Sequence, residues 1–245
     1  MKGDHLQRLP AIKAAKKIIE KHFPNCDGAI LAGSVVRGQE SSTSDLDIVV
    51  FDQKLPASYR ESFLELGWPV ELFCHNLESY QAFFKSDCER ARPCMPRMIA
   101  EGIVLKDNGI IAGVKLEAET LLNSGPEKWD ASIIKLKQYF LTDVLDDFIG
   151  TLNRSEAIFI AGTLAELAAE FVLRTNNRWI GSSKWIHRSL VEFDKDFAGA
   201  FTEAFDLFYT TNDKSKVIHI VKEILEPHGG RLFAGFYLGK GSSDN

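Results

Sequence analysis

Apolar and polar residues follow two different periods along the chain, and the change between them predicts its elements. Residues 5–23 place apolar side chains three and four positions apart with lysines between them, which is typical of an amphipathic helix. Short apolar runs follow at residues 29–32 and 46–51, each bounded by turn-forming residues. The pattern therefore predicts a first helix and then two strands.

The remainder of the first half mixes both periods. We predict a helix over residues 59–66, a third strand over 69–73, a helix over 77–84 and a short fourth strand over 103–105. Helices and strands thus share this half of the sequence.

The second half has helical spacing alone. Gly125 and Pro126 punctuate the change, so we expect domains at residues 1–124 and 125–245. The fold class predicted is α+β, with an N-terminal mixed sheet flanked by helices and a C-terminal helical bundle. The small polar residues from 239 onward are expected to fray. The five predicted helices of the bundle cover residues 133–149, 156–173, 183–192, 196–209 and 214–225.

Composition and charge exclude several classes of protein. The 245 residues include 29 Lys+Arg and 34 Asp+Glu, a formal net charge of −5, and 45% are hydrophobic, as in globular proteins. Nucleic-acid-binding proteins usually carry a basic stripe, so we expect no nucleic acid partner. No apolar run approaches the length of about 20 residues that spans a bilayer, so we expect no membrane contact.

The cysteines and the amino terminus indicate the compartment. The four cysteines form no CxxC pair and lack zinc-site spacing, and the opening MKGDHLQRLP has no apolar signal core. We therefore expect a cytoplasmic protein with reduced thiols. The four cysteines are Cys26, Cys74, Cys88 and Cys94.

The segment AGSVVRGQESSTSDLDIV, residues 32–49, is the most informative for chemistry. Gly33 and Ser34 follow a strand and are expected to open a turn into a short helix. Backbone N–H groups and the Ser34 hydroxyl can then face a phosphate. Capping of that helix by Ser34 is compatible with the same contact.

Two carboxylates follow this turn at alternate positions. In a strand, Asp45 and Asp47 lie on one face, while Leu46 and Ile48 point to the core. Adjacent carboxylates repel each other unless a cation lies between them, which favours a Mg²⁺ site that also receives substrate phosphates. The plainer interpretation is a solvated strand end with a turn at Ser44.

A third carboxylate, Glu71, interrupts the apolar run of the third strand. If that strand lies beside the strand of Asp45, Glu71 joins the same face as a third metal ligand or as the base that accepts a proton. An edge-strand acid facing water is the ordinary alternative.

The order of these features resembles a known superfamily. A strand, Gly33-Ser34, Arg37-Gly38, the run SDLD and a later acidic strand resemble the nucleotidyltransferase superfamily that includes DNA polymerase β and kanamycin nucleotidyltransferase. The stretches GWPVELFCHN, RPCMPRMIAEGIVLKD, LTDVLDDF, NRWIGSSKW and GGRLFAGF extend the likeness to bacterial nucleotidyltransferase-domain proteins with a helical second half. The resemblance implies a catalytic domain over residues 1–124 and a helical substrate- and nucleotide-binding domain over 125–245.

The resemblance also implies a reaction. A nucleoside monophosphate passes from a nucleoside triphosphate, with ATP expected, to a hydroxyl of a small aminoglycoside-like acceptor, and pyrophosphate is released. A two-ion Mg²⁺ site would be held by Asp45, Asp47 and Glu71. The alternatives are an enzyme that adenylylates a protein, or a non-catalytic nucleotide- or partner-binding module with the same fold. The residues expected to bind the nucleotide are Gly33, Ser34, Arg37, Ser44 and Lys184.

Other polar residues each carry two interpretations. Arg37 either binds phosphate or braces its loop, and Lys184 either binds the triphosphate or is a solvated lysine at a helix start. Arg188, one turn further along that helix, is a weaker candidate. An acidic group on one helix is either a solvated face or a surface for a cationic acceptor, and a polar stripe on the next helix either faces solvent or supplies a base. The acidic group is Asp143, Asp146 and Asp147, and the stripe is Thr163, Glu166, Glu170 and Arg174.

Overall fold

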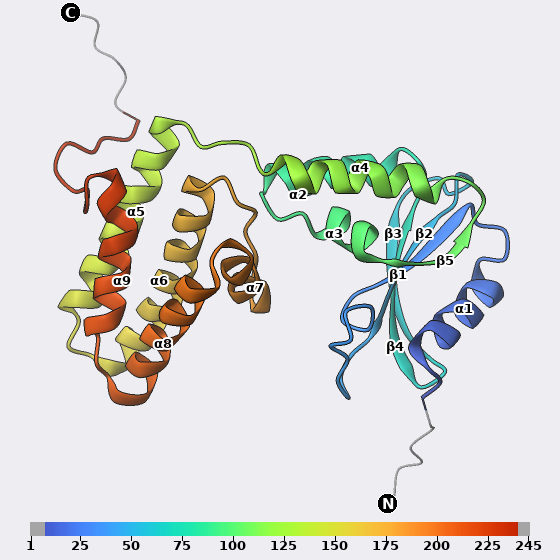
Figure 1. Ribbon diagram of the computed structural model, residues 1–245, viewed down its shortest axis with the longest axis horizontal. Helices are drawn as coiled ribbons and strands as arrows, with labels where there is room; N and C mark the ends of the chain where they lie inside the picture. The colour runs from blue at the N-terminus through green and yellow to red at the C-terminus, as the bar shows by residue number, and fades with distance from the viewer. Residues whose placement is uncertain (1–7, 240–245) are drawn as a thin grey trace, which may run out of the picture. The chain divides into compact units, whose positions relative to one another are not determined.

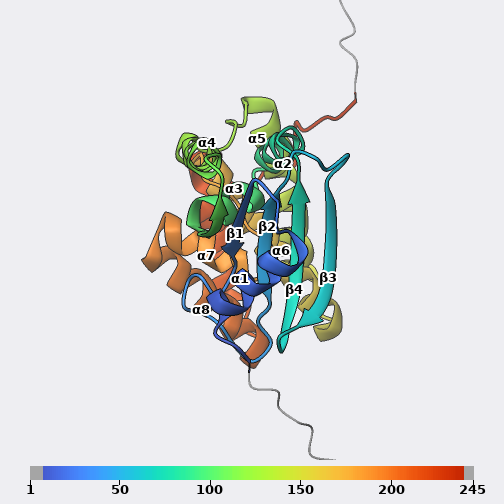
Figure 2. The same ribbon diagram turned by 90° about the vertical axis from the view of Figure 1, so that its right-hand side faces the viewer.

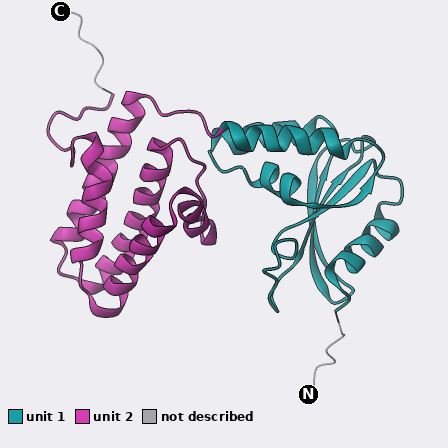
Figure 3. Cartoon of the chain, in the orientation of Figure 1, with its two compact units in different colours: residues 1–124 teal, residues 125–245 magenta. Residues whose placement is uncertain are grey.

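The computed structural model describes residues 8–239 and divides the chain into two compact units, residues 1–124 and 125–245 (Figure 3). The start of the helix predicted over residues 5–23 and nearly all of the tail predicted to fray lie outside the described residues. The first unit is mixed α and β and the second is helical, so the fold class is the predicted α+β.

The first unit is built on a five-stranded sheet with the order β3-β4-β2-β1-β5 (Figure 2). Strands β2 and β4 run parallel, and every other neighbouring pair runs antiparallel. The strands are β1 (Gly28–Ala32), β2 (Leu46–Phe51), β3 (Tyr59–Glu65), β4 (Trp68–His75) and β5 (Ile103–Asp107).

Helices cover both faces of this sheet (Figure 1). On one face, Ile48 and its alternate neighbours on β2 pack with Ile18 of α1 (Ala11–His22). On the other, Val49 and Phe51 pack with three further helices. The central strands are therefore apolar on both sides, which explains the continuous run LDIVVF in place of strict alternation. These three helices are α2 (Ser79–Glu89), α3 (Cys94–Glu101) and α4 (Ile111–Ser124).

The helix predicted over residues 59–66 is wrong, because Tyr59–Glu65 forms the edge strand β3. This strand pairs antiparallel with β4, and Glu65 lies opposite Trp68. The two residues of the turn between them, Leu66 and Gly67, both have positive φ, at 52° and 81°. A leucine in that conformation is unusual, so the sequence lacks the Asn-Gly or Asp-Gly signal that marks most such hairpins.

Two further differences concern helices of the first unit. The short helix expected after Gly33 is absent, and residues 34–38 form successive turns in which the N–H groups of Arg37 and Gln39 both donate to the carbonyl of Ser34. Helices α3 and α4 are present although the periodicity did not predict them. Helix α3 contains Pro96, which is tolerated because it lies in the first turn.

The second unit is a bundle of helices around an aromatic core, with no strand in the part of it that the structure describes. All five predicted helices of this half are present. Phe148, Phe171 and Phe208 are fully or almost fully buried, and the rings of Phe148 and Phe208 meet edge to face with 4.9 Å between their centroids. The helices are α5 (Ala131–Gly150), α6 (Arg154–Thr175), α7 (Lys184–Phe193), α8 (Lys195–Thr211) and α9 (Ser215–Leu225), followed by the 3₁₀ turn η1 (Glu226–His228).

None of the helices within the described residues is both long enough and apolar enough to cross a membrane.

Candidate metal-binding site

Three carboxylates gather on two neighbouring strands of the first unit. Strands β2 and β4 pair in parallel with Asp47 directly beside Glu71, and Asp45 precedes β2 on the same face as Asp47. One ligand oxygen from each of the three side chains lies within 4.8 Å of the others. The pairing of β2 with β4 thus brings together the three acids that the sequence singled out.

The cluster lies where the apolar cover of the sheet ends. Asp47 shares its face of β2 with Val49 and Phe51, which are fully buried, whereas Asp45 and Asp47 are half-buried. Leu46, between the two aspartates, is buried in the core of the opposite face, as predicted. The carboxylates therefore keep access to solvent at the end of the buried part of this face.

Gly33 has no room for a side chain at this position. Strand β1 pairs antiparallel with β2 so that Ala32 lies opposite Asp47, and Gly33 follows with φ of 83°. A Cβ atom on Gly33 would lie 2.1 Å from Oδ2 of Asp47, far inside van der Waals contact. The glycine is therefore required both for the turn and for the close approach of the backbone to the carboxylate.

The three carboxylates of the cluster repel one another. Burial, followed by the charges of Asp45 and Glu71, raises the pKa of Asp47 from 3.8 to about 6. Arg60 and Arg37 act in the opposite direction and lower that pKa. A half-buried carboxylate next to two others is costly, and a bound divalent cation would offset the repulsion.

The loop between Gly33 and Asp45 is held closed by hydroxyl groups. The Ser34 hydroxyl donates to Oγ of Ser44 at 3.0 Å, and the backbone N–H of Ser41 donates to the same oxygen at 2.8 Å. Ser44 is buried and immediately precedes Asp45. In this structure Ser34 and Ser44 therefore fix the loop that presents the aspartates, and their contact with a nucleotide stays a prediction.

Arg37 is tied to α3 by an ion pair with Glu101, with 2.8 Å between Nη1 and Oε2. This contact is the loop-bracing role that the sequence left open beside phosphate binding. The phosphate contact of Arg37 stays a prediction.

Lys184 lies in the other unit, where it is the exposed first residue of α7. The turn before it is tight, since a Cβ on Gly181 would lie 2.2 Å from the backbone of Trp185. Nucleotide binding by Lys184 likewise stays a prediction.

Two of the acidic residues that the sequence singled out in the helical unit, Asp146 and Glu170, form ion pairs that the sequence could not show. Asp146 pairs with Arg231, while Asp143 and Asp147 are exposed. In the polar stripe, Glu170 pairs with Lys137 at 2.8 Å.

Sequence reasoning missed one charged residue of the site, Arg60 on β3. Its Nη2 lies 2.5 Å from Oε2 of Glu71. Arg60 was missed because residues 59–66 were predicted as a helix, which gives no reason to place its side chain beside Glu71. Had this segment been treated as a strand, Arg60 and Ser62 would have been assigned to one face, and pairing with β4 places Ser62 directly opposite Glu71.

The donor set of the cluster fits a hard divalent cation. All three ligands are carboxylates, and Mg²⁺ is bound by oxygen atoms with few protein ligands, leaving coordination positions for water and substrate phosphates. Fold and site together define an α+β protein with a three-carboxylate cluster that could hold a metal ion.

Comparison with solved structures gives only a distant likeness of fold. No family model matches the chain, and no curated protein matches it in sequence. Among solved structures, the chain is similar to a nucleotidyltransferase-like protein from Exiguobacterium sibiricum 255-15, with 12% identity and a TM-score of 0.45 over 88% of this chain and 73% of that one. The chemistry of the site therefore has to follow from its own side chains.

Proposed function

We propose that this protein is a Mg²⁺-dependent nucleotidyltransferase that transfers a nucleoside monophosphate from a nucleoside triphosphate, with ATP the expected donor, to a hydroxyl of a small acceptor. The observation that supports this most directly is the parallel pairing of Asp47 with Glu71, with Asp45 on the same face and the Gly33-Ser34 turn beside them. Carboxylates next to a glycine turn combine a metal site with backbone that can approach a phosphate closely.

The reaction makes one bond to phosphorus and breaks another. The acceptor oxygen bonds to the α-phosphorus, the bond from that phosphorus to the oxygen bridging to the β-phosphate breaks, and pyrophosphate leaves with the electron pair. Asp45, Asp47 and Glu71 would hold Mg²⁺, which when bound would polarise the α-phosphate and neutralise charge on the leaving group. Glu71 serves either as the third ligand or as the group that accepts the hydroxyl proton.

The chain's other residues would position the nucleotide. In the proposal, the backbone N–H groups of the Gly33 turn and the residues Ser34, Arg37 and Ser44 contact the phosphates from the loop. For Lys184, the exposed first residue of α7, triphosphate binding is proposed from the resemblance in sequence alone.

The acceptor is proposed from charge. The exposed Asp143 and Asp147 on α5 would favour a cationic, aminoglycoside-like acceptor, and Asp146 is already partly neutralised by Arg231. A protein acceptor is the alternative. A panel of aminoglycosides, polyamines, neutral sugars and candidate proteins distinguishes the two.

The test is Mg²⁺-dependent release of pyrophosphate with this panel. Asp45→Asn and Asp47→Asn should each lower turnover by at least about a hundredfold while the protein stays folded, because each removes a ligand of the metal. Glu61→Gln is the matched control, since Glu61 lies opposite Leu72 and so on the other face of β3. Near wild-type turnover in either aspartate variant would show that the metal assignment is wrong.

A further inference from the structure

Arg60 contacts the carboxylate cluster from the neighbouring strand. Its guanidinium lies 2.5 Å from Glu71 and stacks over the ring of Phe73, with 4.8 Å between the guanidinium carbon and the ring centroid. The Arg60 side chain is 58% exposed, whereas Glu71 is 27% exposed. Arg60 is therefore a solvent-accessible cation in contact with one of the three candidate metal ligands.

The register of the sheet explains why Arg60 reaches this position. Arg60 pairs directly with Phe73 on β4, so both side chains project from the same face as Glu71, two residues before Phe73. The ring of Phe73 supports the flat guanidinium from below, and the fork of N–H groups is then directed along the strand toward Glu71. Lysine, a compact point charge without a planar fork, would not reproduce both contacts.

The ion pair between Arg60 and Glu71 depends on whether a metal ion is bound. Three carboxylates carry a formal charge of −3, and one arginine that pairs with Glu71 offsets part of it in the protein without a metal. A divalent cation bound by the same carboxylates competes with Arg60 for Glu71 and repels its positive charge. The guanidinium is exposed and carried by a flexible side chain, so it can then move to pair with another anion.

We propose that Arg60 has two alternating partners: Glu71 in the metal-free protein, and a phosphate group of the nucleotide once the cation is bound. This inference rests on the proposed function, which supplies both the cation and the triphosphate. A guanidinium binds phosphate through paired N–H donors as well as it binds a carboxylate. Arg60 is therefore a phosphate-binding residue at the rim of the metal site.

Two opposite effects follow for an Arg60→Ala variant. Without the guanidinium that competes for Glu71, Mn²⁺ used as a probe of the site should bind about three- to tenfold more tightly at low ionic strength. With the metal site saturated, ATP should bind about ten- to a hundredfold more weakly, as expected for loss of a charge-assisted contact. Inorganic tripolyphosphate should show the same loss, and AMP a much smaller one. A residue with a merely structural role would move the affinities for metal and nucleotide in the same direction or not at all.

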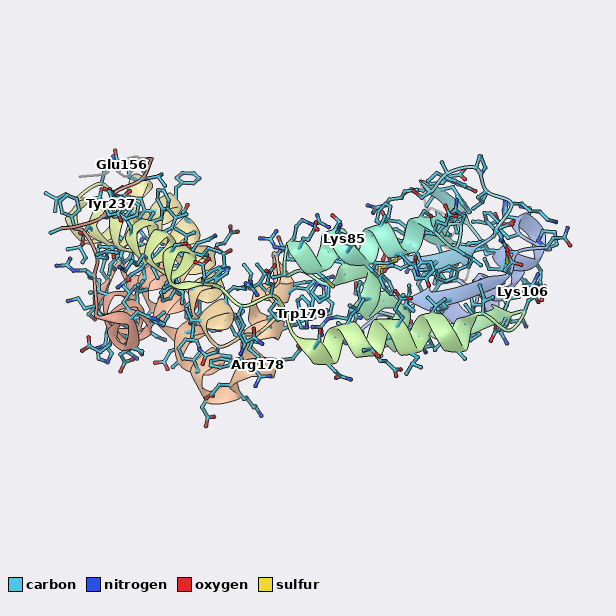
Figure 4. All side chains as sticks on the ribbon, turned by 90° about the horizontal axis from the view of Figure 1, so that it is seen from above. Lys85, Lys106, Glu156, Arg178, Trp179 and Tyr237 are labelled. Atoms are coloured by element: carbon cyan, nitrogen blue, oxygen red, sulfur yellow. The ribbon has the colours of Figure 1, made fainter. Side chains whose placement is uncertain are left out.

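The measurement is titration calorimetry of the full chain with Mn²⁺, and then with ATP, tripolyphosphate or AMP at saturating Mn²⁺. Arg60→Lys keeps the charge without the fork, so its Mn²⁺ affinity should stay within about twofold of wild type while its ATP affinity falls. Lys85→Ala is the control for net charge, since it also removes one positive charge. Lys85 lies on α2 (Figure 4), and its side chain is 79% exposed. It forms a weak ion pair with Glu89, with 3.9 Å between Nζ and Oε1. This control should change both affinities by less than about twofold.

The outcomes separate the inference from the proposed function. If the wild-type protein binds no Mn²⁺, the metal site is wrong, and the proposed function and the inference both fail. If wild type binds Mn²⁺ and ATP but Arg60→Ala leaves both affinities unchanged, or shifts both in one direction, the inference fails and the proposed function stands. Tighter Mn²⁺ binding together with weaker ATP and tripolyphosphate binding, absent in Lys85→Ala, supports the alternation.

Discussion

Asp47 is the residue at which the stability of the fold and the proposed binding of a metal make opposite demands on one side chain. Its pKa of about 6 in the folded protein, caused by burial and then by Asp45 and Glu71, lies above the value near 3.9 expected in the unfolded chain. The folded state therefore holds the proton more tightly than the unfolded state does. The ionised carboxylate costs stability in full above pH 6, and this cost disappears as the pH falls through 6 toward 4.

Replacing Asp47 with asparagine should accordingly stabilise the metal-free protein. At pH 7.5 with a chelator, we expect Asp47→Asn to raise the free energy of unfolding by about 1 to 2 kcal/mol, with the gain shrinking below pH 6 and absent near pH 4. Both proteins contain His75, whose pKa burial lowers to about 4, so its effect cancels in the comparison. Urea unfolding at a series of pH values measures the difference. A gain that does not depend on pH would contradict the raised pKa of Asp47.

At the scale of elements, β3 is a strand that the local pattern of apolar and polar residues does not predict. Tyr59–Glu65 is mostly exposed, and Phe63 is its one side chain that packs against the core cluster. The segment therefore shows no clear alternation of apolar and polar residues. The segment is a strand because β4 offers its unpaired edge, and the hairpin turn at Leu66 and Gly67 joins the two. Its assignment depends on backbone hydrogen bonds with another segment, which a short window of sequence does not show.

Close packing at the start of α7 gives a prediction for a single element. A Cβ on Gly181 would meet the backbone of Trp185 at 2.2 Å, whereas a Cβ on Gly162, within α6, would meet nothing within 4 Å. Gly181→Ala should therefore destabilise the protein by about 2 kcal/mol or more, because relieving the clash requires a shift of the backbone of Trp185. Gly162→Ala, the matched control, should stabilise it by about 0.5 to 1 kcal/mol through helix propensity. Equal effects of the two changes on thermal unfolding would contradict the packing at Gly181.

At the scale of the whole molecule, the candidate metal ligands all belong to the first of two units that each have their own core. A ligand that binds only the folded state stabilises it by about 2.7 kcal/mol at a hundred times its dissociation constant. The units need not share this gain, because local unfolding proceeds in separate cooperative parts.

Hydrogen exchange followed by mass spectrometry tests that expectation. Adding Mg²⁺ should slow exchange in the peptides of β2 and β4, around Asp47 and Glu71, and leave the core of α5 and α6 unchanged. The Asp45→Asn variant should show no slowing with Mg²⁺, because the site has lost a ligand. Equal slowing in both units of the wild-type protein would mean that the cation binds elsewhere or that the units unfold together.

Features that depend on residues close together in the chain could be predicted from the amino-acid sequence. The run at Leu46–Phe51 is apolar enough to predict a buried strand, and alternation within it separates Asp45 and Asp47 from Leu46 and Ile48. The five helices of the second half followed from their period, because an amphipathic face repeats within a few residues.

Which segments pair with one another became known from the folded chain. The parallel pairing of β2 with β4 places Glu71 beside Asp47, and the antiparallel pairing of β3 brings Arg60 to the same face. Neither register can be obtained from periodicity, since strands pair through backbone hydrogen bonds that any residue except proline can make, whether a two-residue turn joins them, as for β3 and β4, or a longer segment separates them, as for β2 and β4. The raised pKa of Asp47 has the same origin, because burial and the charge of Glu71 exist only after those strands have come together.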